Sequence, residues 1–445
     1  MELPPNILDR DIAKAARALI RARRAGAIES PLTEHRNVST RTLYEEIADW
    51  NGPTTPPEPV RAAMRAWVAE LTLARVLWAD SARITAAWRA ESIELEKPDT
   101  TRTSPRALLR RILGDHSMER RRGLAAAFAS GAGGVADAVR IHAERRSEAL
   151  RRLGNVDLDL LELPSNPPAA MTTIARDLLD RTGPMVSAMT IEMQSWSDRI
   201  PAWVGHDAVS GWPARLVPRW IEGLFRGTPL TEGLALDLGP LPTPIGASSF
   251  GRALAQFGAA FAEADVPRAA PFVLARPPHD LRRARRAALF GSLIGDPLFA
   301  SRSLDLGPGV ARDQAREVAA GLLLTLRLDA VRVLLRDDLL RSAAVRGEHL
   351  EELTTHALGA PIPGSLGGVL PSIGADDATR LAGAVLAASD RHALIERFDE
   401  DWWQSPHACR ALRDEQAIVA APVATEAELR AGLDALHRAF AAILA

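Results

Sequence analysis

Apolar residues recur at intervals of three and four through most of the 445-residue chain, a spacing that places them on one face of a helix. Segment 60–93 shows the pattern most clearly. Its apolar stripe comprises Met64, Trp67, Val68, Leu71, Ala74 and Trp78. Segments 169–196, 311–340 and 376–397 have the same character, so the sequence predicts long helices in these places.

Start and stop signals define further helices between breaks rich in Pro and Gly. Ser104 and Pro105 form a good N-cap and first turn, and Gly154 is a stop signal. Thr425 and Glu428 form a capping box at the start of the last helix. The further helices predicted in this way are 106–113, 118–129, 135–153, 249–264, 280–290, 347–358 and a C-terminal helix that ends near Leu444.

Strand signals are scarce, because alternating Val, Ile, Thr and Tyr segments are nearly absent and Tyr44 is the sole tyrosine. The best strand candidate is 234–238. We therefore predict an all-α fold with at most a short β-strand pair before Gly239. We expect two helical lobes that meet near residue 235, an N-terminal lobe of residues 1–235 and a C-terminal lobe of residues 236–445.

Charge and cysteine content exclude several classes of protein. The formal net charge of −2 provides no overall field that would attract nucleic acid or acidic lipid. Cys409 is the single cysteine, so neither an intramolecular disulfide nor a cysteine-based zinc site can form. No signal peptide is recognisable, and no apolar run reaches the about 20 residues that cross a bilayer. We expect a cytoplasmic protein that does not contact a membrane, with an oligomeric state that the sequence leaves open.

Histidine spacing does not favour a metal site. His349, Glu352 and His356 share one helical face, but the two histidines are two turns apart, about 10 Å, which is too far for one zinc ion. A solvated helix face explains this spacing better. Cys409 lies near His407 in sequence, which says nothing about a catalytic dyad. From these residues we predict neither a metal nor a cofactor.

Tryptophans are concentrated between residues 196 and 244, where Pro and Gly are also frequent. The four are Trp196, Trp203, Trp212 and Trp220. Aromatic side chains at this density either line a cleft or attach a loop-rich region to the helical body. The second interpretation is favoured, and the region is also a candidate contact with another protein.

Several segments occur in the order in which a known family of enzymes has them. RFDEDWWQSPHA at 397–408, the helix pairs at 106–154, RAALFGSLIGDP at 286–297 and LTTHALGAPIP at 353–363 are similar to segments of the M3 zinc peptidases. This family includes oligoendopeptidase F and thimet oligopeptidase. The resemblance covers residues 60–415 and implies a two-lobed helical peptidase fold with a central cleft.

The resemblance also implies where the catalytic metal would lie. The zinc helix of the family carries His-Glu-x-x-His, in which both imidazoles bind zinc and the glutamate is the general base. In helix 249–264 the matching positions are Ala255, Gln256 and Ala259. Alanine has no lone pair for a metal, and glutamine does not accept a proton as a carboxylate does.

Two further parts of the family's mechanism have no counterpart. Segment 282–289, which matches the segment of the third zinc ligand, contains no glutamate. Segment 376–381, which matches the oxyanion-stabilising tyrosine, reads DDATRL. The resemblance therefore implies a degenerate member that retains the fold and lacks the catalytic centre.

Three functions follow as hypotheses. The first is an inactive peptidase relative that uses its cleft to bind a peptide or a partner protein, or acts as a scaffold. The alternative is a repurposed, metal-free enzyme acting on a peptide or small molecule, with Gln256, Glu263 and His279 as candidate residues of the cleft. The third is a structural subunit of a larger complex that uses the Trp-rich region as its contact.

Overall fold

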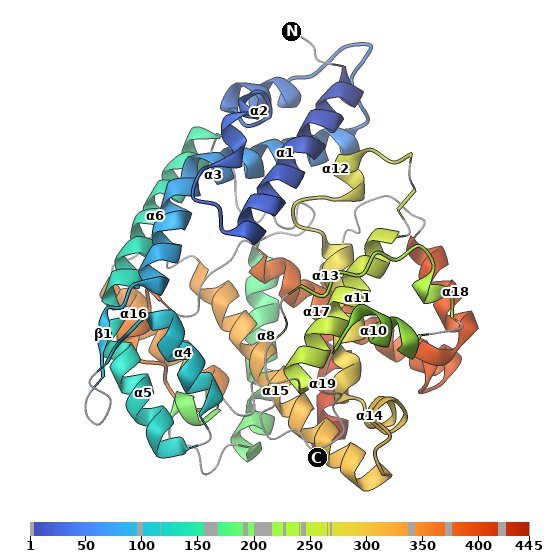
Figure 1. Ribbon diagram of the computed structural model, residues 1–445. Coiled ribbons are helices and arrows are strands. Elements are labelled where there is room, and N and C mark those ends of the chain that lie inside the picture. The colour runs from blue at the N-terminus through green and yellow to red at the C-terminus, as the bar shows by residue number, and fades with distance from the viewer. Residues whose placement is uncertain are drawn as a thin grey trace.

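A computed structural model describes most of the chain. The described residues are 4–95, 101–115, 117–154, 168–189, 195–199, 216–225, 228–239, 241, 246–264, 266–267, 269–336, 343–369, 376–416 and 424–444. Within them the fold is all-α, as the sequence predicts, and helices form nearly all of the regular structure (Figure 1).

The N-terminal part of the chain forms long helices and the one small sheet found in the described residues. Its elements are α1 (Pro5–Ala25), α2 (Arg41–Ala48), α3 (Glu58–Arg89), β1 (Ile93–Glu94), β2 (Arg102–Thr103), α4 (Pro105–Gly114), α5 (Met118–Gly131) and α6 (Gly133–Arg152). Strands β1 and β2 pair antiparallel, with Ile93 opposite Thr103.

The rest of the described chain is helical. Its α-helices are α8 (Pro168–Met189), α10 (Pro218–Leu224), α11 (Ala247–Ala264), α12 (Phe272–Ala275), α13 (Leu281–Gly291), α14 (Pro297–Leu304), α15 (Pro308–Leu335), α16 (Ala343–Leu358), α17 (Asp377–Phe398), α18 (Pro406–Gln416) and α19 (Glu426–Leu444). Short 3₁₀ turns join several of them, among them η3 (Trp196–Arg199) and η5 (Ser292–Gly295).

Local capping explains why these helices begin where the sequence predicts. Ser104 Oγ accepts a hydrogen bond from the amide of Ala107, 3.2 Å away, at the start of α4. At the start of α19, the Thr425 amide donates to Glu428 Oε2 at 2.7 Å, and the Glu428 amide donates to Thr425 Oγ1 at 3.2 Å. This reciprocal pair confirms the predicted capping box.

Two details of the sequence prediction are wrong. Residues 234–238 are not a strand, because no neighbouring segment offers a described strand to pair with; Leu238 is instead buried against the helices. The helix predicted over 60–93 ends at Arg89, because Ile93 belongs to strand β1. The helix predicted over 169–196 is described as far as Met189 and the helix predicted over 311–340 as far as Leu335, and residues 190–194 and 337–340 lie outside the described residues.

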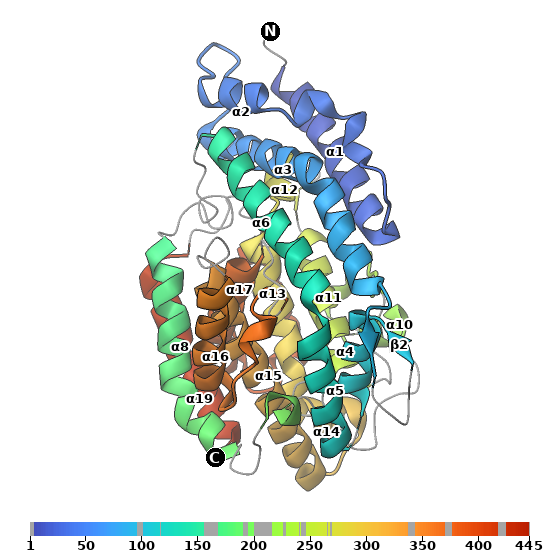
Figure 2. The same cartoon turned by 90° about the vertical axis from the view of Figure 1, so that its left-hand side faces the viewer.

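Three buried clusters of apolar side chains hold the helices together. One lies among α1, α2, α3 and α12, which gather at one end of the molecule (Figures 1 and 2). The second surrounds α11, α13 and α14. The largest joins α4, α5 and α8 to α15, α16, α17 and α19. Because this last cluster draws on residues from both sides of 235, the expected lobe division there stays a prediction.

Glycines allow four helices to pack closely in the order α11, α13, α17 and α19. A Cβ atom added to Gly383 of α17 would lie 2.8 Å from the carbonyl carbon of Ala284 in α13. Cβ atoms added to Gly258 of α11 or Gly432 of α19 would overlap the backbone carbonyl oxygen of Arg286 or of Val385. The four helices therefore form one layer with a glycine at each crossing, and α15 lies across it (Figure 1).

The described tryptophans of the Trp-rich region pack against the helical body. Trp196 is buried in the largest cluster, and Trp220 makes an edge-to-face contact with Phe250 at 4.7 Å between ring centroids. Trp203 and Trp212 lie outside the described residues. Trp196 and Trp220 therefore fit the prediction that this region is attached to the body.

None of the described helices is by itself long and apolar enough to cross a membrane. Helices α5 and α6 together meet the requirements of length and composition, although they are bent by 51° relative to each other.

Candidate functional site

Helix α11, which carries the positions expected of a zinc helix, packs one face closely on α13. A Cβ atom added to Gly291 of α13 would lie 3.3 Å from Cβ of Ala255. One turn later, Gly258 allows the backbone of Arg286 to come into direct contact with α11. Small residues on this face are thus explained by helix packing, since a larger side chain at Gly258 would force the two helices apart.

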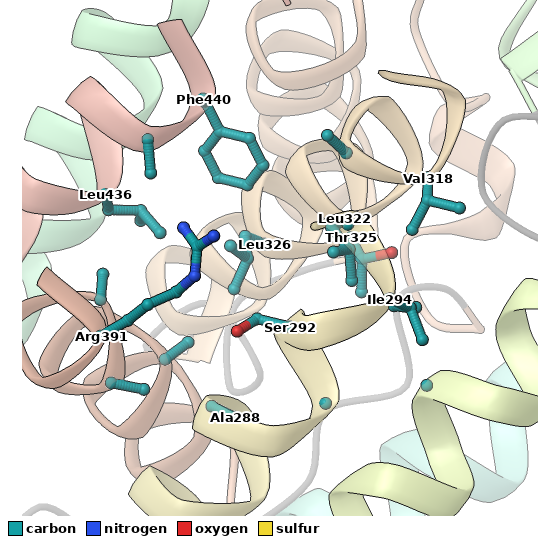
Figure 3. A pocket seen from close by; sticks show the side chains of 18 of the residues that line it. Ala288, Ser292, Ile294, Val318, Leu322, Thr325, Leu326, Arg391, Leu436 and Phe440 are labelled. Atoms are coloured by element: carbon teal, nitrogen blue, oxygen red, sulfur yellow. The ribbon is translucent and has the colours of Figure 1, made fainter. Parts of the chain in front are cut away.

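A cavity of about 740 Å³ begins at this contact and extends between α11, α13, α15, α17 and α19. Figure 3 shows apolar side chains pointing into it from three of these helices and from η5. They include Ile294, Val318, Leu322, Leu326, Leu436 and Phe440. Its volume is in the range of small-molecule binding pockets, about 300–1,000 Å³.

The residues expected at the degenerate zinc site separate into two groups. Ala255 lines the cavity, whereas Ala259 is buried in the core with 6% of its surface exposed. Among the described residues that line the cavity, Gln256, Glu263 and His279 are absent. The structure therefore brings the first of the expected positions, and not the three candidate polar residues, to the cavity.

Glu263 and His279 each have a charged partner elsewhere. Glu263 forms ion pairs with Arg276 at 3.0 Å and Arg283 at 3.4 Å. His279 Nδ1 lies 2.6 Å from Asp376 Oδ1. Partial desolvation acts to raise the pKa of Asp376, but the hydrogen bond and charge of His279, with help from nearby arginines, outweigh it and lower that pKa.

The His279–Asp376 pair also joins the two segments in which the resemblance places the third zinc ligand and the oxyanion tyrosine. His279 lies two residues before α13, where the third zinc ligand is expected, and Asp376 directly precedes α17, where the oxyanion tyrosine is expected. The two segments thus lie side by side in the fold. Neither provides the expected side chain.

Charged groups of the cavity are mostly arginines. Arg380 Nη2 lies 2.9 Å from Asp329 Oδ1 and 2.7 Å from Asp377 Oδ1, and Arg332 also pairs with Asp377 at 2.9 Å. Burial raises the pKa of Asp329, although these two arginines oppose the shift. Asp329 and Arg380 line the cavity, so this network lies where α15 meets the start of α17.

A second arginine, Arg391, reaches into the cavity from α17 (Figure 3). Its Nη2 donates to Asp296 Oδ2 at 2.5 Å. The other oxygen of Asp296 accepts from the amides of Leu298 and Phe299 and so caps α14. Arg391 cannot be recognised in the sequence, because nothing in its helical spacing distinguishes it from the many arginines on solvated faces.

The cysteine is not a plausible nucleophile. Cys409 is fully buried, its thiol lies 3.8 Å from the carbonyl oxygen of Trp403, and burial raises its pKa to about 11. The neighbouring His407 contacts Arg410 instead, at 3.1 Å. A thiol of this kind is almost entirely protonated at neutral pH and therefore unreactive.

Metal-ligand groups do not converge in the part of the chain that the structure describes. No three His, Cys, Asp or Glu side chains there are arranged to hold a metal ion. Of the two histidines His349 and His356, the second faces Asp180, with 3.4 Å between His356 Nε2 and Asp180 Oδ1. The residues at the expected zinc position do not fit the metal, since Ala255 and Ala259 provide no ligand atom.

Comparisons with known proteins find similarity in structure but not in sequence. No family model and no curated protein matches the chain. Trypanosoma cruzi metallocarboxypeptidase 1 is similar in structure with a TM-score of 0.56 and 13% identity, over 99% of both chains. A protein assigned as oligoendopeptidase F from Bacillus anthracis strain Ames gives 0.57 and 10%, over 90% of this chain and 82% of that chain.

These likenesses show that the chain has a helical peptidase-like fold. Both similar proteins are peptidases by name, and the expectation of that fold is confirmed. At 10% and 13% identity the comparison concerns the fold alone, because one fold often carries unrelated functions.

Proposed function

We propose that this protein is a catalytically inactive relative of the M3-like zinc peptidases that binds a peptide or a partner protein, or acts as a scaffold. The observation that carries the proposal is the identity of the residues on α11: Ala255, Gln256 and Ala259 stand where zinc hydrolysis needs two imidazoles and a carboxylate. We also expect a cytoplasmic protein.

The surroundings of Ala255 support this proposal. The one carboxylate among the described residues that line its cavity is Asp329, which is held by Arg380. The one imidazole is His392, which faces Glu396 at 3.4 Å. Helix α13, from which a third ligand is expected, contains four arginines and no acid. None of the described residues would therefore provide a general base for a water molecule beside Ala255.

Zinc analysis and a cleavage assay test the proposal together. Protein purified without added metal is expected to contain far less than one zinc per chain by mass spectrometry, and to leave a quenched-fluorescent peptide library intact. An active zinc peptidase of the same fold, handled in parallel, controls for loss of metal. Stoichiometric zinc together with peptide cleavage that a chelator abolishes would overturn the proposal.

A metal-free enzyme is the second candidate, and the His279–Asp376 pair is the observation that favours it. A carboxylate bound to an imidazole orients the ring and supports a general base. However, no hydroxyl or thiol of a described residue hydrogen-bonds to His279, so the described part of the chain offers the pair no nucleophile. If a substrate screen finds turnover that is lost in both His279→Ala and Gln256→Ala, the enzyme hypothesis replaces the first one.

A further inference from the structure

The cavity between α15 and the helix layer has little capacity for hydrogen bonds. Ser292 Oγ donates to the carbonyl oxygen of Leu289 at 2.8 Å, and Thr325 Oγ1 donates to that of Gly321 at 2.8 Å. The hydroxyls of Ser292 and Thr325, two of the three on described residues that line the cavity (the third is Ser248), are therefore already satisfied by nearby carbonyl oxygens. A buried peptide would leave amide groups unpaired at a cost of about 1–3 kcal/mol each, so an unsubstituted hydrocarbon chain fits this interior better.

The charged groups around this interior are mainly positive. Four arginines line the cavity, Arg252, Arg380, Arg391 and Arg438, against one acid, Asp329. Arg380 is neutralised by Asp329 and Asp377. Arg252 and Arg438 are exposed and form no ion pair with any described residue. The cavity thus combines apolar walls with uncompensated positive charge at its edge.

The positive groups are concentrated at the end formed by α17 and α19. Arg391 and His392 come from α17 and Arg438 from α19, its neighbour in the layer. The guanidinium of Arg391 lies among Leu326, Leu436 and Phe440 (Figure 3). Asp296 binds one of its nitrogens, while Nε is shielded from solvent and has no hydrogen-bond partner among the described residues. The opposite end, at α11, contributes Arg252 alone.

We propose that this cavity binds a free long-chain carboxylate, such as a fatty acid. The carboxylate lies at the α17–α19 end, where Arg438 and Arg391 receive it by charge-assisted hydrogen bonds. The alkyl chain extends past Leu326, Leu322 and Val318 toward Ala255 on α11. This function is separate from the binding of a peptide or protein partner, and it does not depend on whether the chain binds zinc.

Displacement of a fluorescent fatty acid provides the test. Purified full-length protein is titrated with cis-parinarate, which is then displaced by three twelve-carbon competitors: dodecanoate, dodecanol and dodecylammonium. We expect one site per chain and the order dodecanoate, dodecanol, dodecylammonium from tightest to weakest. Equal affinity for the three head groups, or no saturable binding, would overturn the proposal.

Matched arginine variants locate the carboxylate. Arg438→Ala is expected to weaken dodecanoate binding about tenfold and to change dodecanol binding little, because the variant removes a charge at the rim. Arg252→Ala removes another exposed arginine at the other end and is expected to change dodecanoate binding less than twofold. If Arg252→Ala weakens binding and Arg438→Ala does not, the assigned orientation is wrong.

A substitution in the wall of the cavity tests whether the ligand binds there or on another apolar surface. Thr325 is exposed on the cavity side of α15, so Thr325→Trp is expected to fold and to weaken all three competitors at least tenfold by filling the space. Ala388→Phe on α17 narrows the same space and serves as a second variant, with folding of both checked by circular dichroism. The proposal is contradicted if both folded variants bind the competitors as the wild type does. It is also contradicted if the protein binds anionic vesicles but not monomeric dodecanoate.

Discussion

At the scale of single residues, Arg327 of α15 donates several buried hydrogen bonds to neighbouring helices. Its side chain is fully buried in α15. Nε donates to the Ala357 carbonyl at 2.7 Å and Nη2 to the His356 carbonyl at 2.6 Å. Nη1 donates to the Leu179 carbonyl at 2.6 Å. Burial lowers its pKa to about 10, which still leaves it charged at neutral pH. It therefore ties the end of α16 and helix α8 to α15, and the positive charge suits the C-terminal end of α16.

Replacing Arg327 with Met is expected to destabilise the protein by about 3 kcal/mol, because three buried carbonyl groups lose their donor. Urea denaturation followed by circular dichroism measures the loss. Arg312→Met, on the exposed face of the same helix, is the matched control and should stay within about 0.5 kcal/mol of the wild type. Similar stability of the two variants would show that the contacts of Arg327 contribute little.

At the scale of elements, close helix packing explains how the helix layer is held together. It also explains the small residues of α11. Helices α11, α13, α17 and α19 approach one another at Gly258, Gly383 and Gly432. The small side chains of α11 can be read from the sequence as an emptied metal site, and in the fold the same residues allow contact with α13. Ala255 fits both interpretations, because it lies against Gly291 and also lines the cavity.

Gly258→Ala is expected to cost about 1–3 kcal/mol, because the new methyl group would overlap the carbonyl oxygen of Arg286 and separate α11 from α13. Thermal and urea unfolding measure the effect. Gly123→Ala provides the control: Gly123 is exposed within α5, no atom lies within 4 Å of the added Cβ, and the substitution should stabilise by about 0.5–1 kcal/mol. If Gly258→Ala is as stable as Gly123→Ala, the close contact is not required.

The sequence predicts those parts of the fold that are determined by local signals. The positions of α4, α5, α13 and α19 follow from caps and apolar spacing, which act within a few residues. The strand expected at 234–238 fails because pairing requires a distant partner, which short-range pattern does not reveal. The lining of the cavity is not predicted either, since five helices far apart in sequence form it and its Arg391 resembles any surface arginine.

At the scale of the whole molecule, contacts between distant segments join the N-terminal helices to the region around α13. The carboxylate of Asp9 in α1 accepts hydrogen bonds from the amides of Phe272 and Val273, at 2.9 and 3.0 Å. Trp67 Nε1 in α3 donates to the carbonyl oxygen of Arg276 at 2.7 Å. A few residues later, His279 binds Asp376 at the start of α17. These bonds align the beginning of α13 with α1 and α3 on one side and with α17 on the other.

The His279–Asp376 contact predicts a pH dependence of stability. Because the folded pKa of Asp376 is lowered, its contribution is complete above its unfolded pKa, about 3.9, and is lost as the pH falls through the folded pKa. Asp376→Asn should therefore reduce the free energy of unfolding at pH 7, by about 0.5 kcal/mol because the aspartate is mostly exposed and the pair is screened.

The difference between Asp376→Asn and the wild type should shrink below pH 4, where the wild-type carboxylate also becomes neutral. Urea titrations at pH 7, 5, 4 and 3 measure it. Asp313→Asn, an exposed aspartate of α15 without an ion pair to a described residue, should show no such change with pH. If the difference in the free energy of unfolding between Asp376→Asn and the wild type instead stays constant down to pH 3, the charge of Asp376 does not stabilise the junction of α13 and α17.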